Sequence, residues 1–222
     1  MKTIKIVNNL IVRCSSLHKI MTKSRSKSSP LSETTKTYVQ DQAKESFYGI
    51  RVKLESKYFD KGNRNENLAI EMVNQIRFKE YTKNEVRKTE SWLTGECDVE
   101  AKDSIIDVKC SWSFDSFPCY ESEALKIMKR SGYDWQVRGY MYLYDKPTAE
   151  VIWCMTSTPS DLMTAYDDPA IHKVDHIDPE RRMTAVKVDR DPALEELMIT
   201  QYNLANEYYK QCILELQNKN KL

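Results

Sequence analysis

The pattern of apolar and polar positions predicts strands and helices that alternate along the chain. In the strand-like stretches apolar residues recur at every second position or run together, and β-branched residues are frequent. Such stretches lie at residues 4–13, 88–94, 97–101, 104–110, 150–157 and 182–189. The stretch at 150–157 is predominantly apolar, which predicts a strand buried in the sheet.

A tight hairpin is predicted between two of these strands, because only Lys102 and Asp103 separate them. Side chains alternate along a strand, so Asp107 and Lys109 project from one face and the apolar residues beside them from the other. Asp98 lies near the start of the partner strand. We therefore expect the two aspartates to face each other across the hairpin.

Over most of the remaining chain, apolar residues recur at the spacing of an α-helix. We expect helices at residues 15–24, 33–57, 63–76, 121–130, 133–144 and 192–217, with a short one beginning near Thr158 or Ser160. Ser15 or Ser16 would cap the first helix and Ser32 the second, while Gly62 would break the chain before the third. The third helix would bury one face, formed by Leu68, Ile70, Met72, Val73 and Ile76.

Length and composition favour one globular α/β unit. The 222 residues are 41% hydrophobic and 30% charged, and no internal repeat or linker divides them. No apolar run is long enough to cross a bilayer, and the amino-terminal stretch mixes charged and apolar residues, unlike a signal peptide. Six cysteines at irregular intervals form no C-x-x-C pair, so we expect reduced thiols and a cytoplasmic protein without a membrane partner.

The net charge of +1 does not by itself indicate a nucleic-acid partner, but the distribution of charge is uneven. Residues 1–32 carry seven Lys or Arg side chains and no acidic one, which suits binding to phosphates. A solvated arm is the alternative interpretation.

Two carboxylates and one cation are predicted to meet on the hairpin, namely Asp98, Asp107 and Lys109. A structural ion pair is the simpler interpretation of any two of them. One lysine cannot neutralise both carboxylates among the apolar residues of these strands, so a divalent cation would complete the charge balance. Oxygen ligands favour Mg²⁺ or Mn²⁺ over Zn²⁺.

These residues resemble the signature of the PD-(D/E)XK nuclease superfamily. Asp98 matches the aspartate of its first strand, and Asp107-Val108-Lys109 matches the D-x-K of the next. An upstream G-x-x-x-E is present at Gly62 and Glu66, and a downstream Q-x-x-x-Y at Gln136 and Tyr140. This order and spacing, spanning residues 10–157, is similar to the lambda-exonuclease, YqaJ-like and RecB-type branch found in phage recombination.

The resemblance implies a restriction-endonuclease-like fold of the α/β class. Its core would have three layers, α/β/α, with a central mixed sheet flanked by helices. Residues 1–60 would form a DNA-end region, 61–157 the nuclease core, and 158–222 a terminal strand and helix of one nuclease domain.

The same resemblance implies roles for particular side chains around a metal ion. Asp98, Asp107, the Val108 carbonyl and Glu66 would hold Mg²⁺, for which Mn²⁺ can substitute, and Lys109 would orient the attacking water. Gln136 and Tyr140 would contact the DNA backbone or steady Lys109. Iron-sulfur relatives need four cysteines, three of them clustered near the carboxyl terminus; here only two lie there, so no cluster is expected.

The amino-terminal residues also resemble that branch, in which this segment approaches the terminal phosphate. Arg13, Ser15 and Ser16 would bind phosphate. Trp112 could stack on terminal bases, although packing under its own loop is an equally good interpretation of an aromatic residue there.

The resulting hypothesis is a metal-dependent DNA exonuclease, 5′ to 3′ on duplex ends. Its partners would be DNA, a recombinase or single-strand annealing protein, and other copies of itself, in the host cytoplasm if a phage encodes it. A structure-specific or restriction-like endonuclease and an inactive DNA-binding module are the alternatives. The presence of Asp98, Asp107 and Lys109 together disfavours the inactive module.

Overall fold

The computed structural model describes residues 9–26, 28–53 and 55–219. Its strands are β1 (Val12–Arg13), β2 (Lys88–Glu90), β3 (Leu93–Gly95), β4 (Val99–Glu100), β5 (Ser104–Cys110), β6 (Thr148–Cys154) and β7 (Met183–Asp189). Its α-helices are α1 (Leu17–Ile20), α2 (Glu33–Tyr48), α3 (Lys57–Arg77), α4 (Glu121–Ser131), α5 (Tyr133–Tyr144), α6 (Pro169–His172) and α7 (Pro192–Lys219). Short 3₁₀ turns lie at Cys14–Ser16, Phe114–Ser116, Ser160–Leu162 and Pro179–Arg182.

The strands form two mixed sheets. The larger has the order β4-β5-β6-β7, with β5 and β6 parallel and the outer pairs antiparallel. The smaller has the order β1-β3-β2. The α/β class is therefore confirmed, while the central sheet is divided in two. The pairing of Val99 with Ile106 confirms the hairpin with its turn at Lys102 and Asp103.

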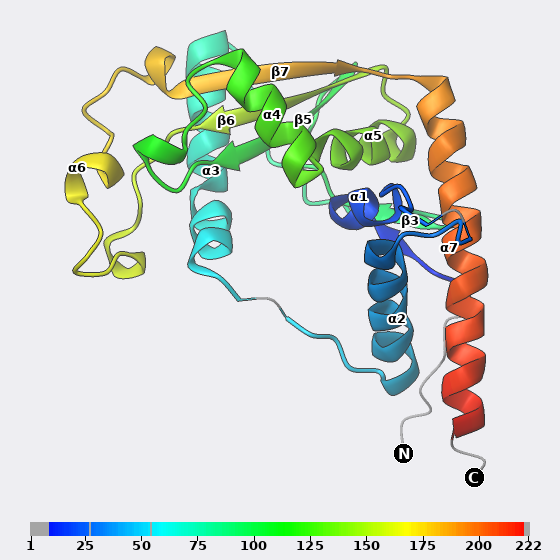
Figure 1. The fold of residues 1–222 in the computed structure, drawn as a ribbon. Helices are drawn as coiled ribbons and strands as arrows, with labels where there is room; N and C mark the ends of the chain where they lie inside the picture. Colours follow the sequence, from blue (N-terminus) through cyan, green and yellow to red (C-terminus); the bar gives the residue numbers. More distant parts are fainter. Residues whose placement is uncertain (1–8, 27, 54, 220–222) are drawn as a thin grey trace.

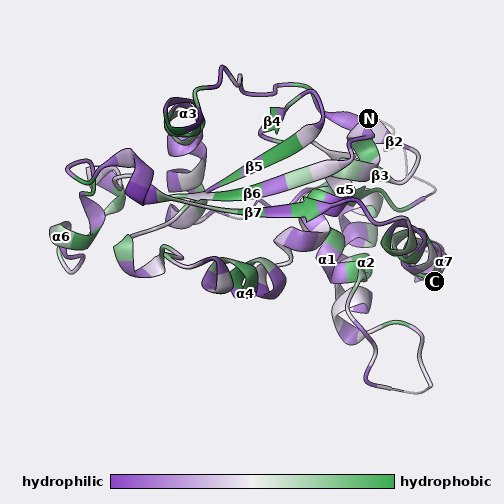
Figure 2. Cartoon of the chain, turned by 90° about the horizontal axis from the view of Figure 1, so that it is seen from above, coloured by the Kyte–Doolittle hydropathy of each residue, from purple (hydrophilic) through white to green (hydrophobic). Residues whose placement is uncertain are grey.

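Helices cover both faces of the larger sheet. Helix α3 packs on one face, where Ile106 and Val108 of β5 share an apolar cluster with Ala69 and Val73. Helices α4 and α5 lie on the other face, and the view along the sheet shows this three-layer order (Figure 2). Because Ile106 and Val108 face α3, the side chain of Asp107 between them points toward α5, as the alternation predicts.

A second layer of helices adjoins the smaller sheet. Helices α2 and α7 lie side by side, at a distance from α3 (Figure 1). The backbone N–H of Leu10 donates to Asn206 Oδ1 of α7 at 2.8 Å, which ties the amino-terminal segment to this pair. Helix α1 of this segment contacts both helices of the pair and also α5, which covers the larger sheet.

The structure corrects the predicted break between the second and third helices. Helix α2 ends at Tyr48, because Gly49 adopts a left-handed conformation with φ of 65°. Helix α3 begins at Lys57, where Ser56 Oγ accepts from the Tyr58 N–H at 3.3 Å. Gly62 therefore lies inside α3 instead of preceding it. The prediction of Ser32 as a cap is confirmed, since Ser32 Oγ accepts from the Thr35 N–H at 3.0 Å.

Several other boundaries differ from the prediction. The expected strand at 4–13 is reduced to Val12–Arg13, and residues 4–8 of it lie outside the described residues. The strand at 88–94 is split at Ser91, whose φ of 40° does not fit a strand. Leu68 is exposed, and the helix expected after Thr158 is a single 3₁₀ turn. Within the described ranges, no helix has the length and apolar character needed to span a membrane.

Candidate active site

The β4–β5 hairpin brings the two predicted aspartates together. Asp98 immediately precedes β4, and its Oδ2 accepts a hydrogen bond from the Val108 N–H on β5 at 2.7 Å. Asp107 in the middle of β5 is only 1% exposed. The backbone of Val108 on β5 thus fixes the Asp98 carboxylate beside Asp107.

Both oxygens of Asp107 are engaged, but differently. Oδ1 accepts a hydrogen bond from Gln136 Nε2 of α5 at 3.1 Å. Oδ2 lies 2.7 Å from Lys109 Nζ, yet within the described residues it is a buried oxygen that accepts no hydrogen bond of good geometry. A buried carboxylate oxygen held only by an ion pair retains capacity for a further cation.

Lys109 lies on the same face of β5 as Asp107 and is 21% exposed at its side chain. Its Nζ also stands 4.6 Å from the centre of the Tyr133 ring, a cation–π distance. Burial disfavours the charge, but the carboxylates of Asp107 and Asp98 outweigh this and raise the pKa of Lys109 above its ordinary value. The ammonium is therefore charged at neutral pH.

Gln136 and Tyr140 occupy one face of α5, one turn apart. The Gln136 amide donates to Tyr140 Oη at 3.1 Å as well as to Asp107. Burial raises the pKa of the Tyr140 phenol, and the charge of Asp107 raises it further. Gln136 and Tyr140, the predicted Q-x-x-x-Y pair, are therefore connected to the site through the hydrogen bond from Gln136 to Asp107.

Glu66 of α3 lies near enough to Asp98 for the two carboxylate charges to interact. Its Oε1 lies 3.0 Å from Lys83 Nζ, an ion pair that the sequence does not predict. Burial raises the pKa of Asp98 well above its usual value, Asp107 adds to the rise, Lys109 opposes it, and Glu66 adds a smaller contribution. The neighbouring carboxylates Asp107 and Glu66 thus disfavour the charged form of Asp98, while Lys109 favours it. Lys83 stands in an irregular segment outside any motif, so no sequence signal marks it.

The donor set fits a hard divalent cation. Among the described residues, no three side chains of His, Cys, Asp or Glu form a ready-made metal cage. Mg²⁺ does not need one, because it commonly binds through one or two carboxylates and keeps several waters. The under-bonded Asp107 Oδ2 and the strongly raised pKa of Asp98 are both consistent with a place for positive charge between them.

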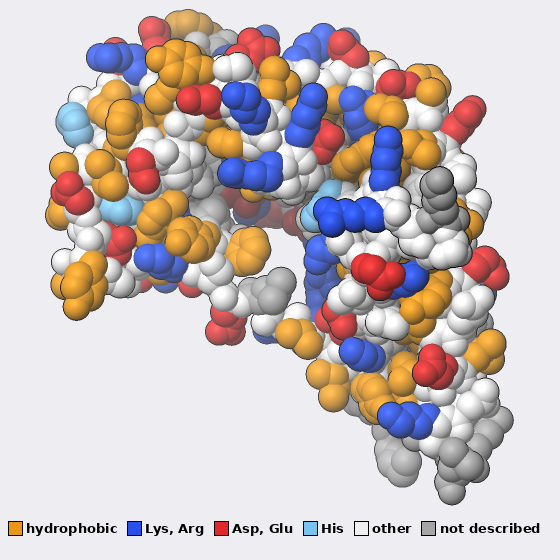
Figure 3. Space-filling model, viewed as in Figure 1, with side chains coloured by type: hydrophobic (Ala, Val, Ile, Leu, Met, Phe, Trp, Pro, Cys, Tyr) orange, Lys and Arg blue, Asp and Glu red, His pale blue; other side chains and the backbone are white. Residues whose placement is uncertain are grey.

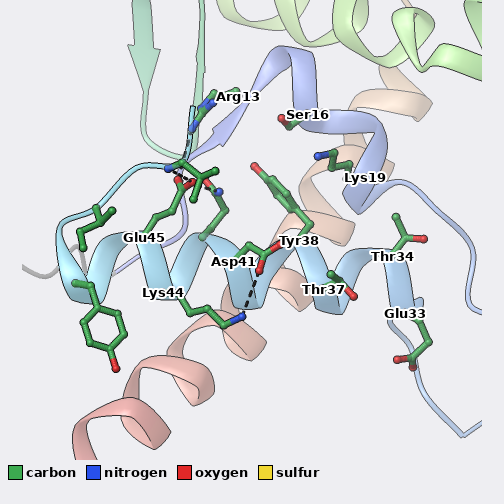
Figure 4. Close-up of a pocket in the computed structure, with 14 residues that line it drawn as sticks. Arg13, Ser16, Lys19, Glu33, Thr34, Thr37, Tyr38, Asp41, Lys44 and Glu45 are labelled. Carbon is green, nitrogen blue, oxygen red and sulfur yellow. Dashed lines mark hydrogen bonds and ion pairs between the residues drawn. The ribbon is translucent and has the colours of Figure 1, made fainter. Parts of the chain in front are cut away.

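A cavity of about 910 Å³ lies beside the amino-terminal segment. Arg13, Ser16 and Tyr38 point into it, and Glu45 lies 3.8 Å from the Arg13 guanidinium (Figure 4). Ser15 is exposed and does not line this cavity. The predicted cap is also absent, because the Ser16 side chain makes no capping bond to α1.

The amino-terminal segment is packed tightly against the helix that carries Gln136 and Tyr140. A Cβ atom on Gly139 of α5 would stand 3.1 Å from Cys14 Sγ. One on Gly95 of β3 would stand 2.7 Å from both Cys14 Sγ and the Tyr140 ring. These two glycines permit the close approach. Cys14, the residue after Arg13, is thereby held close to Gly139 of α5 and Gly95 of β3.

Trp112, which follows β5, is part of an aromatic cluster. Its ring lies 5.1 Å from that of Tyr58 and 5.3 Å from that of His172, both edge to face, with Lys57 Nζ 4.5 Å from its centre. The packing interpretation of Trp112 is thus the one that the geometry favours, although the ring remains partly exposed. His172 is buried against Trp112 and Thr158.

The surface is hollowed between the part containing α3 and α6 and the part containing α2 and α7 (Figure 3). Lys and Arg side chains border this hollow (Figure 3). A polyanion entering there would meet cationic side chains.

Similarity to known proteins is found at the level of structure. The sequence matches no family model and no curated protein. The structure is similar to that of a phage-related exonuclease from Haemophilus somnus 129PT, with 36% identity over 94% of this chain and 97% of the other and a TM-score of 0.88.

More distant similarity is found to an alkaline exonuclease, LHK-Exo, from Laribacter hongkongensis. Identity is 14% over 95% of this chain and 93% of that one, with a TM-score of 0.65. For LHK-Exo in complex with dAMP the values are 14% identity, 96% and 94% coverage, and a TM-score of 0.64. At this identity the likeness concerns the fold alone.

Proposed function

The chain belongs to the phage-type, lambda-exonuclease-like family of PD-(D/E)XK nucleases, and we propose on that premise that it is a divalent-metal-dependent exonuclease acting 5′ to 3′ on duplex DNA ends. The observation that carries the proposal is the arrangement of Asp98, Asp107 and Lys109 on one hairpin, braced by Gln136. This is the constellation needed to bind a metal ion and a scissile phosphate together.

The metal ligands in this proposal are carboxylates and a carbonyl. Asp98 and Asp107 would hold Mg²⁺ or Mn²⁺, with the Val108 carbonyl as a further ligand and Glu66 holding a second ion or a bound water. When bound, the ion supplies a Lewis acid for the phosphate and lowers the pKa of the attacking water. The Gln136 amide keeps Asp107 oriented, because it fixes Oδ1 and leaves Oδ2 directed toward Lys109.

Lys109 serves as an electrostatic stabiliser in this mechanism. Its raised pKa keeps the ammonium protonated at neutral pH, so it is unsuited to accept the proton of the attacking water. A fixed cation 2.7 Å from Asp107 instead orients that water and stabilises negative charge that develops on the phosphate oxygens. Tyr140, whose pKa is raised, remains a neutral hydroxyl beside Gln136.

The cavity beside Arg13 is proposed to receive the terminal 5′ phosphate. Arg13 and Ser16 supply a guanidinium and a hydroxyl, groups that bind phosphate oxygens well. Ser15, placed outside the cavity, would contact DNA only at its rim. Trp112 packs against Tyr58 and His172, and only its exposed part would contact the bases or sugar near the end. Separate sites for the terminal phosphate and for cleavage would give the enzyme its polarity.

Family membership supports two further proposals about partners. The single strand left by digestion would pass to a recombinase or single-strand annealing protein. The enzyme would act as a homo-oligomer, in the host cytoplasm where phage DNA is processed.

Digestion of one labelled plasmid in two forms tests the proposed activity. The linear, 5′-phosphorylated form should be degraded with Mg²⁺ and protected by EDTA, and mononucleotides should appear from the 5′ end first. The covalently closed form should stay intact. Cleavage of the closed circle would instead establish an endonuclease, and digestion of neither form would refute nuclease activity on duplex DNA.

A further inference from the structure

Lys61 is a lysine whose side chain lies inside the protein, only 1% exposed. Its Nζ donates to the carbonyl oxygens of Ser111 at 2.5 Å, Trp112 at 2.8 Å and Thr156 at 2.8 Å, and to Thr158 Oγ1 at 2.9 Å. No carboxylate in the described part of the chain forms an ion pair with it at 4.0 Å or less. Neutral oxygen atoms therefore hold a buried positive charge.

The four acceptors come from two loops at one end of the larger sheet. Ser111 and Trp112 follow β5, directly after the strand that carries Asp107 and Lys109. Thr156 and Thr158 follow β6, the parallel neighbour of β5. Thr158 Oγ1 also donates to the Trp112 carbonyl at 2.7 Å, so the two loops are joined to each other as well as to Lys61.

Asn65 extends this attachment by one turn of α3. Its Nδ2 donates to Thr156 Oγ1 at 2.9 Å and to the Ser157 carbonyl at 2.8 Å. Lys61 and Asn65 are spaced i, i+4 and therefore share one face of the helix. Asn65 is the residue immediately before Glu66, the carboxylate that approaches Asp98 from α3. The helical turn that Lys61 and Asn65 attach to the two loops thus ends next to Glu66, the candidate metal ligand.

Burying the Lys61 ammonium costs folding free energy, which the hydrogen bonds that it makes have to offset. Burial lowers the pKa of Lys61 to about 8, with Cys110 and Asp175 acting in the opposite direction. A methionine would fill a similar volume without desolvating a charge. What methionine cannot do is donate to three carbonyls and a hydroxyl, and charge-assisted hydrogen bonds of this kind are stronger than neutral ones.

We propose that Lys61 is a positioning residue for the metal site: its ammonium fixes α3 against the carboxyl end of β5, so that Glu66 is held opposite Asp98 and Asp107. The proposal rests on the metal-dependent function argued above. Lys61 itself contacts neither the aspartates nor the DNA in this proposal. Its loss should weaken metal binding and lower kcat while leaving KM for DNA unchanged.

Titration with Mn²⁺ in the absence of DNA, followed by calorimetry, tests this inference. Lys61→Met should bind Mn²⁺ about tenfold to a hundredfold more weakly than wild type, as is typical when a group that orients metal ligands is removed. Arg64→Gln is the matched control. Arg64 lies on the same helix and reaches the same region, at Asp161 Oδ2 2.6 Å away, but is exposed. It should keep wild-type affinity.

The outcomes separate this inference from the proposed function. If wild type binds no Mn²⁺, the metal-dependent function fails, and the inference with it. If Asp107→Asn abolishes binding but Lys61→Met retains wild-type affinity, only the inference fails; equal losses in Lys61→Met and Arg64→Gln also overturn it. Should Lys61→Met not fold, Lys61→Gln takes its place, and unfolding of both would make Lys61 purely structural and refute the positioning role.

Discussion

Gln136 Nε2 lies 3.1 Å from Asp107 Oδ1, which links the middle of α5 to the middle of β5. The same amide donates to Tyr140 Oη, so its two N–H groups are both used. The bond fixes one oxygen of a carboxylate that is otherwise held by Lys109 alone. Gln136 is thus the residue of α5 that orients Asp107 in the candidate site.

Replacing Gln136 with methionine should therefore lower kcat without unfolding the protein. Methionine has a similar volume but donates nothing, so Asp107 loses the hydrogen bond that orients it. We expect kcat to fall about tenfold to a hundredfold. Steady-state digestion of linear duplex measures this, with the melting temperature as the check on folding. An unchanged kcat would show that the Gln136–Asp107 bond has no part in catalysis.

The metal-free protein should become more stable on Asp98→Asn at neutral pH. Burial and Asp107 raise the pKa of Asp98 well above 3.8. Above about pH 4 and up to the raised pKa, the folded protein keeps a proton that the unfolded chain has released, so its free energy of unfolding falls as pH rises through this window. Asparagine carries no charge and can still accept from the Val108 N–H.

Urea denaturation at about pH 5 and about pH 8 in EDTA checks this expectation. The difference in free energy of unfolding between Asp98→Asn and wild type should be larger at the higher pH, and Mg²⁺ should reduce it by stabilising wild type alone. A difference that is the same at both pH values would mean that Asp98 carries no unfavourable charge in the folded state.

Arg13→Met should remove the preference for a 5′-phosphorylated end. Loss of one charge-assisted hydrogen bond to phosphate weakens binding by about tenfold to a hundredfold. The preference is measured as the ratio of kcat/KM for 5′-phosphate and 5′-hydroxyl duplexes. Lys36→Met on α2, where Lys36 pairs with Glu33 at 2.8 Å and does not line the cavity, is the control. A ratio unaffected by Arg13→Met places the terminal phosphate elsewhere.

Gly132→Ala should destabilise the protein, whereas Gly62→Ala should not. Gly132 has φ of +74°, and a Cβ there would lie 2.3 Å from the Cβ of His18. The left-handed conformation alone costs about 1–2 kcal/mol for alanine, or roughly 2–8 °C in melting temperature for a chain of this size. Gly62 lies inside α3, and a Cβ added there would meet nothing within 4 Å, so alanine should stabilise the helix. Thermal denaturation by circular dichroism compares the two, and equal shifts would contradict this expectation.

The placement of the main candidate site residues could be predicted from the sequence because it depends on local periodicity. Alternation along residues 104–110 places Asp107 and Lys109 on one face, and the i, i+4 spacing of Gln136 and Tyr140 places them together on α5. The predicted helix at 133–144 agrees with the structure at both ends. Each of these features is decided within a few residues.

Other features differ from the sequence prediction, and most of them depend on contacts between distant residues. Gly62 reads as a helix breaker, but the capping hydroxyl of Ser56 starts α3 before it. No pattern in the sequence marks Lys61 as buried, because the two loops that accept its hydrogen bonds lie 50 and 95 residues away. The division of the sheet and the close approach of Cys14 to Gly139 likewise depend on tertiary packing.

The most direct test of the proposed site compares Asp107→Asn with Asp103→Asn in the digestion of 5′-phosphorylated linear duplex with Mg²⁺. Both changes remove one carboxylate from the same hairpin, but Asp103 is exposed in its turn while Asp107 is buried beside Lys109. We predict that Asp107→Asn lowers the rate at least about a hundredfold, as loss of a metal ligand or an oriented charge does, and that Asp103→Asn digests at the wild-type rate. Digestion by Asp107→Asn at the wild-type rate would contradict the proposed site.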